Sequence, residues 1–387
     1  MHKFELSVYK GIWEDKNVIT QILQNPELIK ANHTFWRQDF SVDPNITETN
    51  AEGEAVFTSR MRPIDTGVLM DMRAPLGDST PEDVKGMEAY QGTIQEFISK
   101  GYVETAEMRD YKRRLFAEIG DATLVRRFAE EVLQPRIDSA NQTLSHMAAQ
   151  LISTGKIIYN QGVGMKGSIL KAAIPTANFL RAGAKVWTDT SALLLDQMRK
   201  IEQDFRDATG LAIPMQWKIT RQMFNDVFLK NEQIVKWIKD MYLVESGQIG
   251  VGTTNLSGLV VNEDNFNKYI TKVQGLSPIV IVDEKQHDSI KGTVHGWADG
   301  VAVYCPAGKL GLIRRTTIAD LRLFSEEYTN PNTTFTFGTA LDGCAFVRNS
   351  IVPNGVLKEW HSDLVLAATP TLDEFLYHYI VDTTTAD

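Results

Sequence analysis

The chain has 387 residues, which is enough for two or three ordinary domains or for one elongated unit with several lobes. Hydrophobic residues make up 43% and charged residues 23%, so extensive disorder and a fibrous repeat are excluded. The formal net charge is −9, and an acidic chain is a poor non-specific ligand for nucleic acid, since such binding needs clustered Lys and Arg. This disfavours a sequence reader or a polymerase. It leaves open a protein that surrounds nucleic acid without gripping it.

Membrane and disulfide classes are also disfavoured. No apolar run approaches the roughly 18 residues that a bilayer span needs. The N-terminus has no long apolar stretch and carries an early acid, Glu5, so no secretory signal is predicted. The two cysteines, Cys305 and Cys344, are too few for a disulfide scaffold or, alone, for a structural zinc site.

The first part of the chain predicts a short helix, an arm and a hairpin. Residues 18–29 have a helical pattern, and residues 43–53 are polar, as in a loop or an extended arm. Strand-like segments at 56–58, 67–72 and 92–98 flank a connection rich in Pro, Gly and Asp. This pattern predicts a long hairpin, whose connection is either functional or a plain surface loop.

A long helix is predicted over residues 121–154. Asp121 is a candidate N-cap, and apolar residues then recur at steps of three and four as far as Ile152. Pro135 is either the first-turn residue of a second helix or a kink, and Gly155 is the expected stop. Polar residues line the other side: Arg136, Gln142 and Ser145. The helix is therefore amphipathic and is expected to lie against another part of the chain.

The remaining segments mix helices and strands. Helical patterns cover 104–119, 191–209 and 221–240, and the basic run inside the first of these is interpreted as a solvated face. A strand is predicted over 211–220, and most segments after residue 278 are β-like. Strands and helices that alternate on no regular schedule predict an α+β fold.

One glycine-rich loop is a candidate nucleotide-binding site. Gly162, Gly164 and Gly167 fit the G-x-G-x-x-G pattern, which needs a following helix that presents its N-terminus to a pyrophosphate. Pro175 cuts the following segment after about two turns, so a strand connection explains the glycines better. An oxidoreductase that uses this loop stays open as the enzyme alternative.

Other candidate chemistry is explained by ordinary structure. The nearby polar residues Asp283, Glu284, His287, Asp288 and His295 match no metal-site spacing and are interpreted as a loop between strands. Cys344 begins an apolar strand and reads as a buried structural thiol.

The segment 360–363 contains the residue types of a catalytic triad, but neighbours along a strand point to opposite faces. The sequence thus predicts no catalytic, cofactor-binding or metal-binding residue and no cofactor, and the chain is not expected to be an enzyme.

The end of the predicted long helix carries a specific resemblance. Residues 147–157 read MAAQLISTGKI, and this run resembles the end of the spine helix in the major capsid proteins of tailed double-stranded DNA bacteriophages, of the lambda-like major capsid protein E family. The hairpin return at 92–104 and the strands within 353–381 are similar to that family in pattern. The resemblance implies the Hong Kong 97-type capsid fold, which is α+β.

The resemblance also implies a division of the chain into named parts. These are an N-terminal arm (1–55), an extension loop (56–105), a peripheral domain (106–254) with the spine helix at about 121–154, an axial domain (255–340) and C-terminal strands that return to the peripheral domain (341–387). Inter-subunit contacts are expected in the extension loop, at Arg62, Met70, Asp71, Met72 and Arg73. No covalent cross-link is predicted, because no partner Asn is identifiable for Lys85 or Lys100.

As such a protein, the chain is expected to self-assemble as hexamers and pentamers into an icosahedral head that encloses double-stranded DNA without sequence-specific binding. Expected partners are scaffolding, portal and possibly cementing proteins, and no membrane. No charged helical leader is evident, which favours a separate scaffolding protein or none. The expected location is the virion capsid, assembled in the host bacterial cytoplasm. An encapsulin-like compartment shell is the alternative within the same fold.

Overall fold

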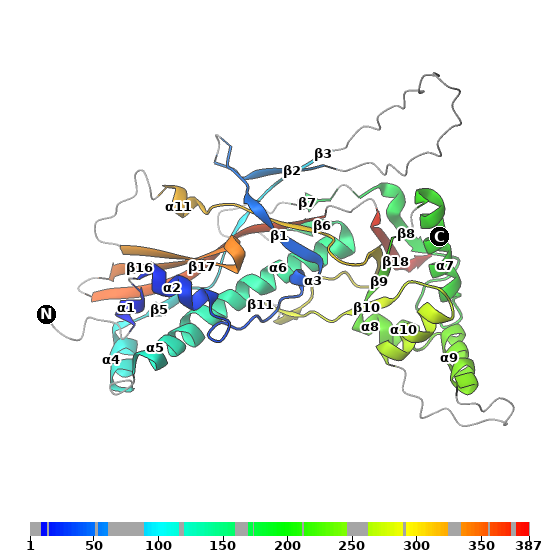
Figure 1. The fold of residues 1–387 in the computed structure, drawn as a ribbon, viewed down its shortest axis with the longest axis horizontal. Helices are drawn as coiled ribbons and strands as arrows, with labels where there is room; N and C mark the ends of the chain where they lie inside the picture. Colours follow the sequence, from blue (N-terminus) through cyan, green and yellow to red (C-terminus); the bar gives the residue numbers. More distant parts are fainter. Residues whose placement is uncertain are drawn as a thin grey trace, which may run out of the picture.

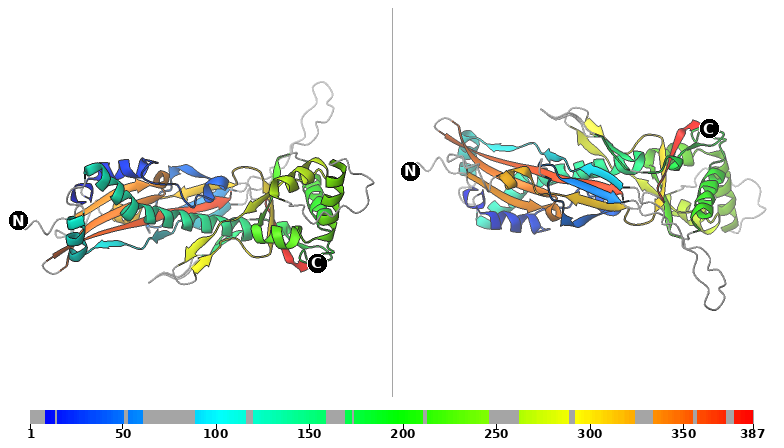
Figure 2. Two further views of the ribbon diagram at one scale, coloured as in Figure 1. Left: turned by 90° about the horizontal axis from the view of Figure 1, so that it is seen from below. Right: turned by 90° about the horizontal axis from the view of Figure 1, so that it is seen from above.

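The computed structural model has two lobes at the two ends of an elongated chain, each with its own hydrophobic core (Figures 1 and 2). A long helix runs through the first lobe and reaches the second. The structure describes residues 9–13, 15–50, 53–60, 89–115, 120–158, 169–172, 174–210, 213–245, 262–288, 292–323, 334–354, 357–372 and 377–386.

The sheet of the first lobe is assembled from both ends of the chain. Its main path runs through β1 (Phe40–Ile46), β14 (Gly311–Arg315), β17 (Leu357–Leu372), β16 (Ala345–Asn354) and β15 (Thr334–Ala340). Of these, β1 and β14 pair parallel, and the other neighbours pair antiparallel. Two short strands, β4 (Glu96–Ile98) and β5 (Tyr102–Glu104), also pair with β17.

The predicted long helix is confirmed, with an irregular turn inside it. It consists of α5 (Asp121–Phe128), the π-helical turn η2 (Ala129–Leu133) and α6 (Gln134–Thr154). Pro135, which has no N–H to donate, lies in the first turn of α6 and follows directly on the π-helical turn that interrupts the regular hydrogen bonding. Gly155 ends the helix with φ = 67°, a left-handed conformation that glycine adopts without strain.

The predicted polar side of this helix is not left to solvent, which corrects the simple amphipathic expectation. Arg136 and Ser145 are buried. The Arg136 Nε donates to the carbonyl of Ser362 at 3.1 Å, and the Ser145 hydroxyl donates to the carbonyl of His33 at 2.7 Å. The helix is therefore enclosed between the sheet and the N-terminal segment, because its polar groups find partners on both.

The second lobe has a mixed sheet covered by helices. Its strand order is β10 (Ile279–Val282), β9 (Met215–Thr220), β13 (Val301–Pro306), β18 (Tyr379–Ala386) and β8 (Phe179–Ala182). The accompanying helical elements are α7 (Leu194–Thr209), α8 (Arg221–Met223), the π-helical turn η4 (Phe224–Phe228), α9 (Glu232–Glu245) and α10 (Glu263–Lys272). Aromatic rings fill its core, with Trp217 and Tyr304 centred 4.9 Å apart.

The smaller elements complete the described chain. They are α1 (Lys10–Trp13), α2 (Lys16–Gln24), α3 (Trp36–Asp39), β2 (Val56–Arg60), β3 (Ala89–Thr93), α4 (Ala106–Leu115), β6 (Lys156–Ile158), β7 (Ile169–Lys171), η3 (Thr176–Asn178), β11 (Gln286–Asp288), β12 (Gly292–Val294), α11 (Ala319–Leu323) and η6 (Leu341–Gly343). Mixed helix and strand without a regular βαβ order confirms the α+β class.

The core of the second lobe takes residues from both sides of position 254, and the predicted bounds of the named parts stay a prediction. This core joins Trp217, which precedes that position, to Tyr304 and Val381, which follow it. The reason is strand pairing over long distances in the sequence: β9 pairs with both β10 and β13, and β18 pairs with β13 in the same sheet. The second lobe is therefore built from segments on both sides of residue 254.

An outer strand of the second sheet has its edge covered by side chains. The Asn267 side chain accepts from the N–H of Ile279 at 2.7 Å and donates to the carbonyl of the same residue at 2.7 Å. Glu263 accepts from the N–H of Ile281 at 3.4 Å. Helix α10 thus occupies backbone groups of β10 that an added strand would otherwise use.

Replacement of a buried residue of the long helix tests the enclosure. Leu144 is fully buried, so Leu144→Ala is expected to lower the free energy of unfolding by about 2–5 kcal/mol, as measured by urea denaturation of the soluble chain. The control is Thr143→Ala, because the half-buried Thr143 hydroxyl bonds only to the carbonyl of Ser139 in its own helix. A loss below about 1 kcal/mol is expected for the control, and equal losses for both would contradict the packing.

Candidate assembly surface

The predicted inter-subunit residues, Arg62, Met70, Asp71, Met72 and Arg73, lie outside the described residues, so their role stays a prediction. The strands that lead toward them do pair: β2 and β3 run antiparallel from Val56↔Thr93 to Arg60↔Ala89. The base of the predicted hairpin is therefore confirmed.

The base of this hairpin is packed against the body of the first lobe. A Cβ added at Gly92 would lie 2.5 Å from a methyl group of Leu170 and 2.6 Å from the ring of Phe57. Glycine at this position allows β3 to approach β7 closely, because no side chain intervenes. The described base of the hairpin, β2 and β3, is thus fixed on the first lobe (Figure 1).

The N-terminal segment lies along the long helix and is fixed there by side chains. The Trp36 indole donates to the Asn141 side chain at 3.0 Å. About two helical turns nearer the N-terminus of α6, Gln134 accepts from the Lys30 N–H at 2.7 Å and donates to the Lys30 carbonyl at 3.0 Å. Both contacts join residues more than a hundred positions apart, so they set the register of the segment on the helix.

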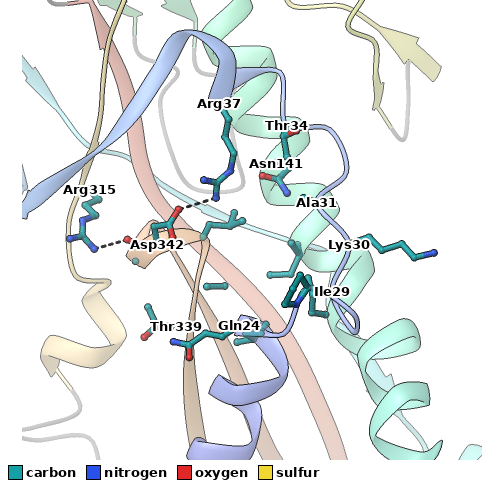
Figure 3. Close-up of a pocket in the computed structure, with 16 residues that line it drawn as sticks. Gln24, Ile29, Lys30, Ala31, Thr34, Arg37, Asn141, Arg315, Thr339 and Asp342 are labelled. Carbon is teal, nitrogen blue, oxygen red and sulfur yellow. Dashed lines mark hydrogen bonds and ion pairs between the residues drawn. The ribbon is translucent and has the colours of Figure 1, made fainter. Parts of the chain in front are cut away.

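A pocket opens where this segment, α6 and the η6 turn meet (Figure 3). Its volume is about 510 Å³. An ion pair of 2.9 Å joins Arg37 to Asp342, and the Arg315 guanidinium donates to the carbonyl of Asp342 at 2.7 Å. Asp342 has φ = 57°, a left-handed conformation that is costly without glycine. The two arginines therefore hold a strained turn. Both guanidinium groups already have partners within this chain.

A buried ion pair connects the two lobes. The Asp39 carboxylate of α3 pairs with the Lys218 ammonium of β9, and both side chains are 3% exposed. Burial raises the pKa of the Asp39 carboxyl above its ordinary value, although Lys218 opposes the shift. Removing one partner of such a pair leaves a buried charge uncompensated, which is expected to cost several kcal/mol.

A buried histidine makes a second connection between the lobes. The His378 Nε2–H donates to the carbonyl of Ile152, near the end of α6, at 2.6 Å. Burial lowers the pKa of the His378 imidazole from 6.5 to about 4, and the nearby Lys218 ammonium adds to the shift. His378 is therefore a neutral structural donor at neutral pH.

A polar cluster lies at the opposite end of the first lobe. The Lys112 ammonium lies 2.5 Å from the Glu131 carboxylate and 2.5 Å from the Tyr102 hydroxyl. The Tyr9 hydroxyl donates to the same carboxylate at 3.2 Å. Burial, followed by the nearby Glu131 and Glu104 carboxylates, raises the pKa of the Tyr9 hydroxyl. The phenol therefore stays protonated and acts as a donor.

The cysteine and histidine residues that were weighed as catalytic or metal-binding candidates have structural positions. Cys305 and Cys344 are buried, and burial raises the pKa of each thiol to about 12, so neither carries a reactive thiolate at neutral pH. His295 lies 3.6 Å from Asp299, and His33 lies 3.8 Å from Glu284. Within the described part of the chain, no group of three or more His, Cys, Asp or Glu residues is placed to hold a metal ion.

The glycine-rich loop 162–167 of the nucleotide hypothesis lies outside the described residues, so the structure says nothing of it. No helix among the described segments has the length and apolarity for a bilayer crossing.

The comparisons with known proteins give no match among family models and none among curated proteins. Among solved structures, the chain is similar to the putative capsid protein of a prophage of E. coli CFT073, with 14% identity, 76% of this chain and 79% of that chain covered, and a TM-score of 0.47. It is similar to a phage-related protein of Bordetella bronchiseptica RB50, with 11% identity, coverage of 95% and 96%, and a TM-score of 0.47. The mature capsid of bacteriophage PhiM1 gives 12% identity, coverage of 90% and 86%, and a TM-score of 0.40. Likenesses at this level assign neither a fold family nor a function.

The ion pair between the lobes can be tested by a double-mutant cycle. Lys218→Met is expected to lower the free energy of unfolding by about 3–5 kcal/mol in urea denaturation, because Asp39 is left buried and unpaired. The double variant Asp39→Asn/Lys218→Met should lose less than the sum of the two single variants. Lys230→Met is the control, since its exposed 2.7 Å pair with Asp226 should contribute no more than about 1 kcal/mol. Additive losses at Asp39 and Lys218 would refute the coupling.

The pH dependence of unfolding tests His378. Its folded pKa lies below its unfolded pKa, so the unfolded chain binds the proton more tightly, and this histidine destabilises the fold as the pH falls from 6.5 toward 4. The difference of 2.5 pH units corresponds to about 3 kcal/mol. His378→Gln should remove that part of the pH dependence in urea unfolding between pH 7 and 4.5, with the exposed His287→Gln as the matched control variant. An unchanged profile for His378→Gln would contradict the assignment.

Proposed function

We propose that this chain is the major capsid protein of a tailed double-stranded DNA bacteriophage, with the Hong Kong 97-type fold. The observation that carries the proposal is the position of the run MAAQLISTGKI: residues 147–154 form the end of one long helix that joins two lobes, Gly155 stops the helix, and the last two residues of the run begin β6. The sequence resemblance to the spine helix of that family thus falls on an element with the shape of a spine.

The other parts of the chain are proposed to take the roles that the resemblance names, with the two lobes in place of the bounds 106–254 and 255–340. Residues 1–55 are the N-terminal arm and residues 56–105 the extension loop. The first lobe is the peripheral domain. The second lobe, which includes β8 to β10, β13 and β18, is the axial domain that meets its copies at the centre of a capsomer.

The subunit is proposed to form hexamers and pentamers that close into an icosahedral head around double-stranded DNA. An acidic chain suits a container, because a wall of net charge −9 per subunit does not adhere to the packaged DNA. Scaffolding, portal and possibly cementing proteins are its proposed partners. Assembly takes place in the host bacterial cytoplasm, and the final location is the virion capsid.

The first experiment is expression of the chain alone, followed by negative-stain electron microscopy and light scattering. Closed shells, tubes or hexameric rings are the expected result. Particles that co-purify with an enzyme cargo would favour the encapsulin-like alternative. A chain that stays monomeric at every concentration, with and without a co-expressed scaffolding protein, would overturn the proposal.

A deletion tests the proposed extension loop. Removal of residues 76–87 should leave a folded subunit, because it deletes none of the described core residues. Closed-shell assembly should fall at least tenfold in particle counts, because the loop that carries the assigned contact residues is shortened and no longer reaches the neighbouring subunit. The control is an equally long Gly/Ser replacement of the same residues, which keeps the length of the loop and should therefore assemble. Normal shells from the deletion would refute the loop's assignment.

A further inference from the structure

Helix α4 is arranged with its cations inside and apolar side chains outside. Arg109 is 1% exposed and Lys112 is 6% exposed. Tyr111 is 66% exposed and Leu115 is 56% exposed, and Met108 is also exposed. A surface helix of an isolated protein normally has the reverse arrangement, because burial of apolar side chains is favourable and burial of charge is costly.

The rotation of α4 about its axis is held by the buried ammonium group. Lys112 pairs with Glu131 at 2.5 Å and lies 5.1 Å from the ring centre of Tyr9 and 5.0 Å from that of Tyr102. A rotation that buried the apolar side chains would withdraw Lys112 from these partners and leave the Glu131 carboxylate without its cation. The exposed apolar face is thus a consequence of the fold and not of a loosely held helix.

The three exposed apolar residues form one continuous face. Met108, Tyr111 and Leu115 are spaced by three and four positions, so they lie on the same side of the helix. Helix α4 lies at the end of the elongated chain that is remote from the second lobe (Figures 1 and 2). A single exposed apolar residue needs no explanation, but three on one helix face indicate a contact surface.

The charges around this face favour a second copy of the same chain as the occupant. Both signs are exposed at this end of the lobe: Glu107 on α4, and Arg126, Arg127 and Glu130 on the neighbouring α5 and η2. Because both signs are present on one surface, a copy related by a two-fold rotation can place opposite signs against each other. A partner of one charge sign would meet repulsion from half of these groups.

We propose that the α4 face, defined as Met108, Tyr111 and Leu115, packs against the α4 face of a second copy, as a contact between capsomers at the remote end of the first lobe. This inference rests on the proposed shell function. Three side chains supply only part of the roughly 800 Å² per partner that a stable interface buries. The contact therefore operates together with other contacts in an assembly and does not make a dimer by itself.

Single-cysteine cross-linking tests the proposal in assembled particles. Both native cysteines are buried, so an introduced surface cysteine is the one that reacts. Packed helices lie about 8–10 Å apart, which a short bismaleimide spans. Tyr111→Cys is expected to give covalent dimers at least tenfold above Leu193→Cys, a matched control with 59% exposure on the second lobe.

The possible outcomes separate this inference from the function on which it rests. Shells that form without Tyr111→Cys dimers, or with equal linking at both positions, overturn the α4 contact and leave the shell function standing. Failure of the wild-type chain to assemble overturns both. As a second variant, Tyr111→Asp should release free capsomers from a folded subunit, whereas Tyr111→Phe should assemble normally; normal shells from Tyr111→Asp would also overturn the contact.

Discussion

The geometry of the whole chain depends on the long helix of residues 121–154, which extends about 50 Å at 1.5 Å per residue. The N-terminal segment, the β17 sheet and the end of the second lobe all take their positions from it, through Trp36, Ser362 and His378. A helix has one fixed rise per residue, so these contacts cannot slide independently of one another. The distance between the two lobes is set by covalent geometry and backbone hydrogen bonds together.

Local patterns in the sequence predicted the elements that depend on near neighbours. The helix over 121–154, its stop at Gly155 and the paired strands at the base of the hairpin follow from periodicity and from glycine chemistry. The thiol of Cys344 lies buried at the start of a strand, as its apolar surroundings indicated. These features are encoded within a few residues of where they occur.

Local patterns in the sequence did not predict features that depend on contacts between distant residues. Asp39 and Lys218 are separated by 179 positions, and neither has a local signal that names the other. Lys112 belongs to a basic run that reads as solvated, yet its ammonium is buried because Glu131 of the π-helical turn faces it. The second sheet is a further example, since β18 joins it from the far end of the chain. The candidate contact residues of the hairpin rest on the resemblance alone.

The covered edge of β10 affects how closely copies of the second lobe can pack without pairing their strands. A sheet edge with free N–H and carbonyl groups recruits further strands, and the rate of that recruitment rises with local concentration. Where many copies of the second lobe converge on one axis, the effective concentration of each edge for its neighbours is very high. The hydrogen bonds from Asn267 and Glu263 occupy the groups that would start such pairing. In the proposed shell, neighbouring second lobes can then approach closely at the β10 edge through side chains, without strand pairing at that edge.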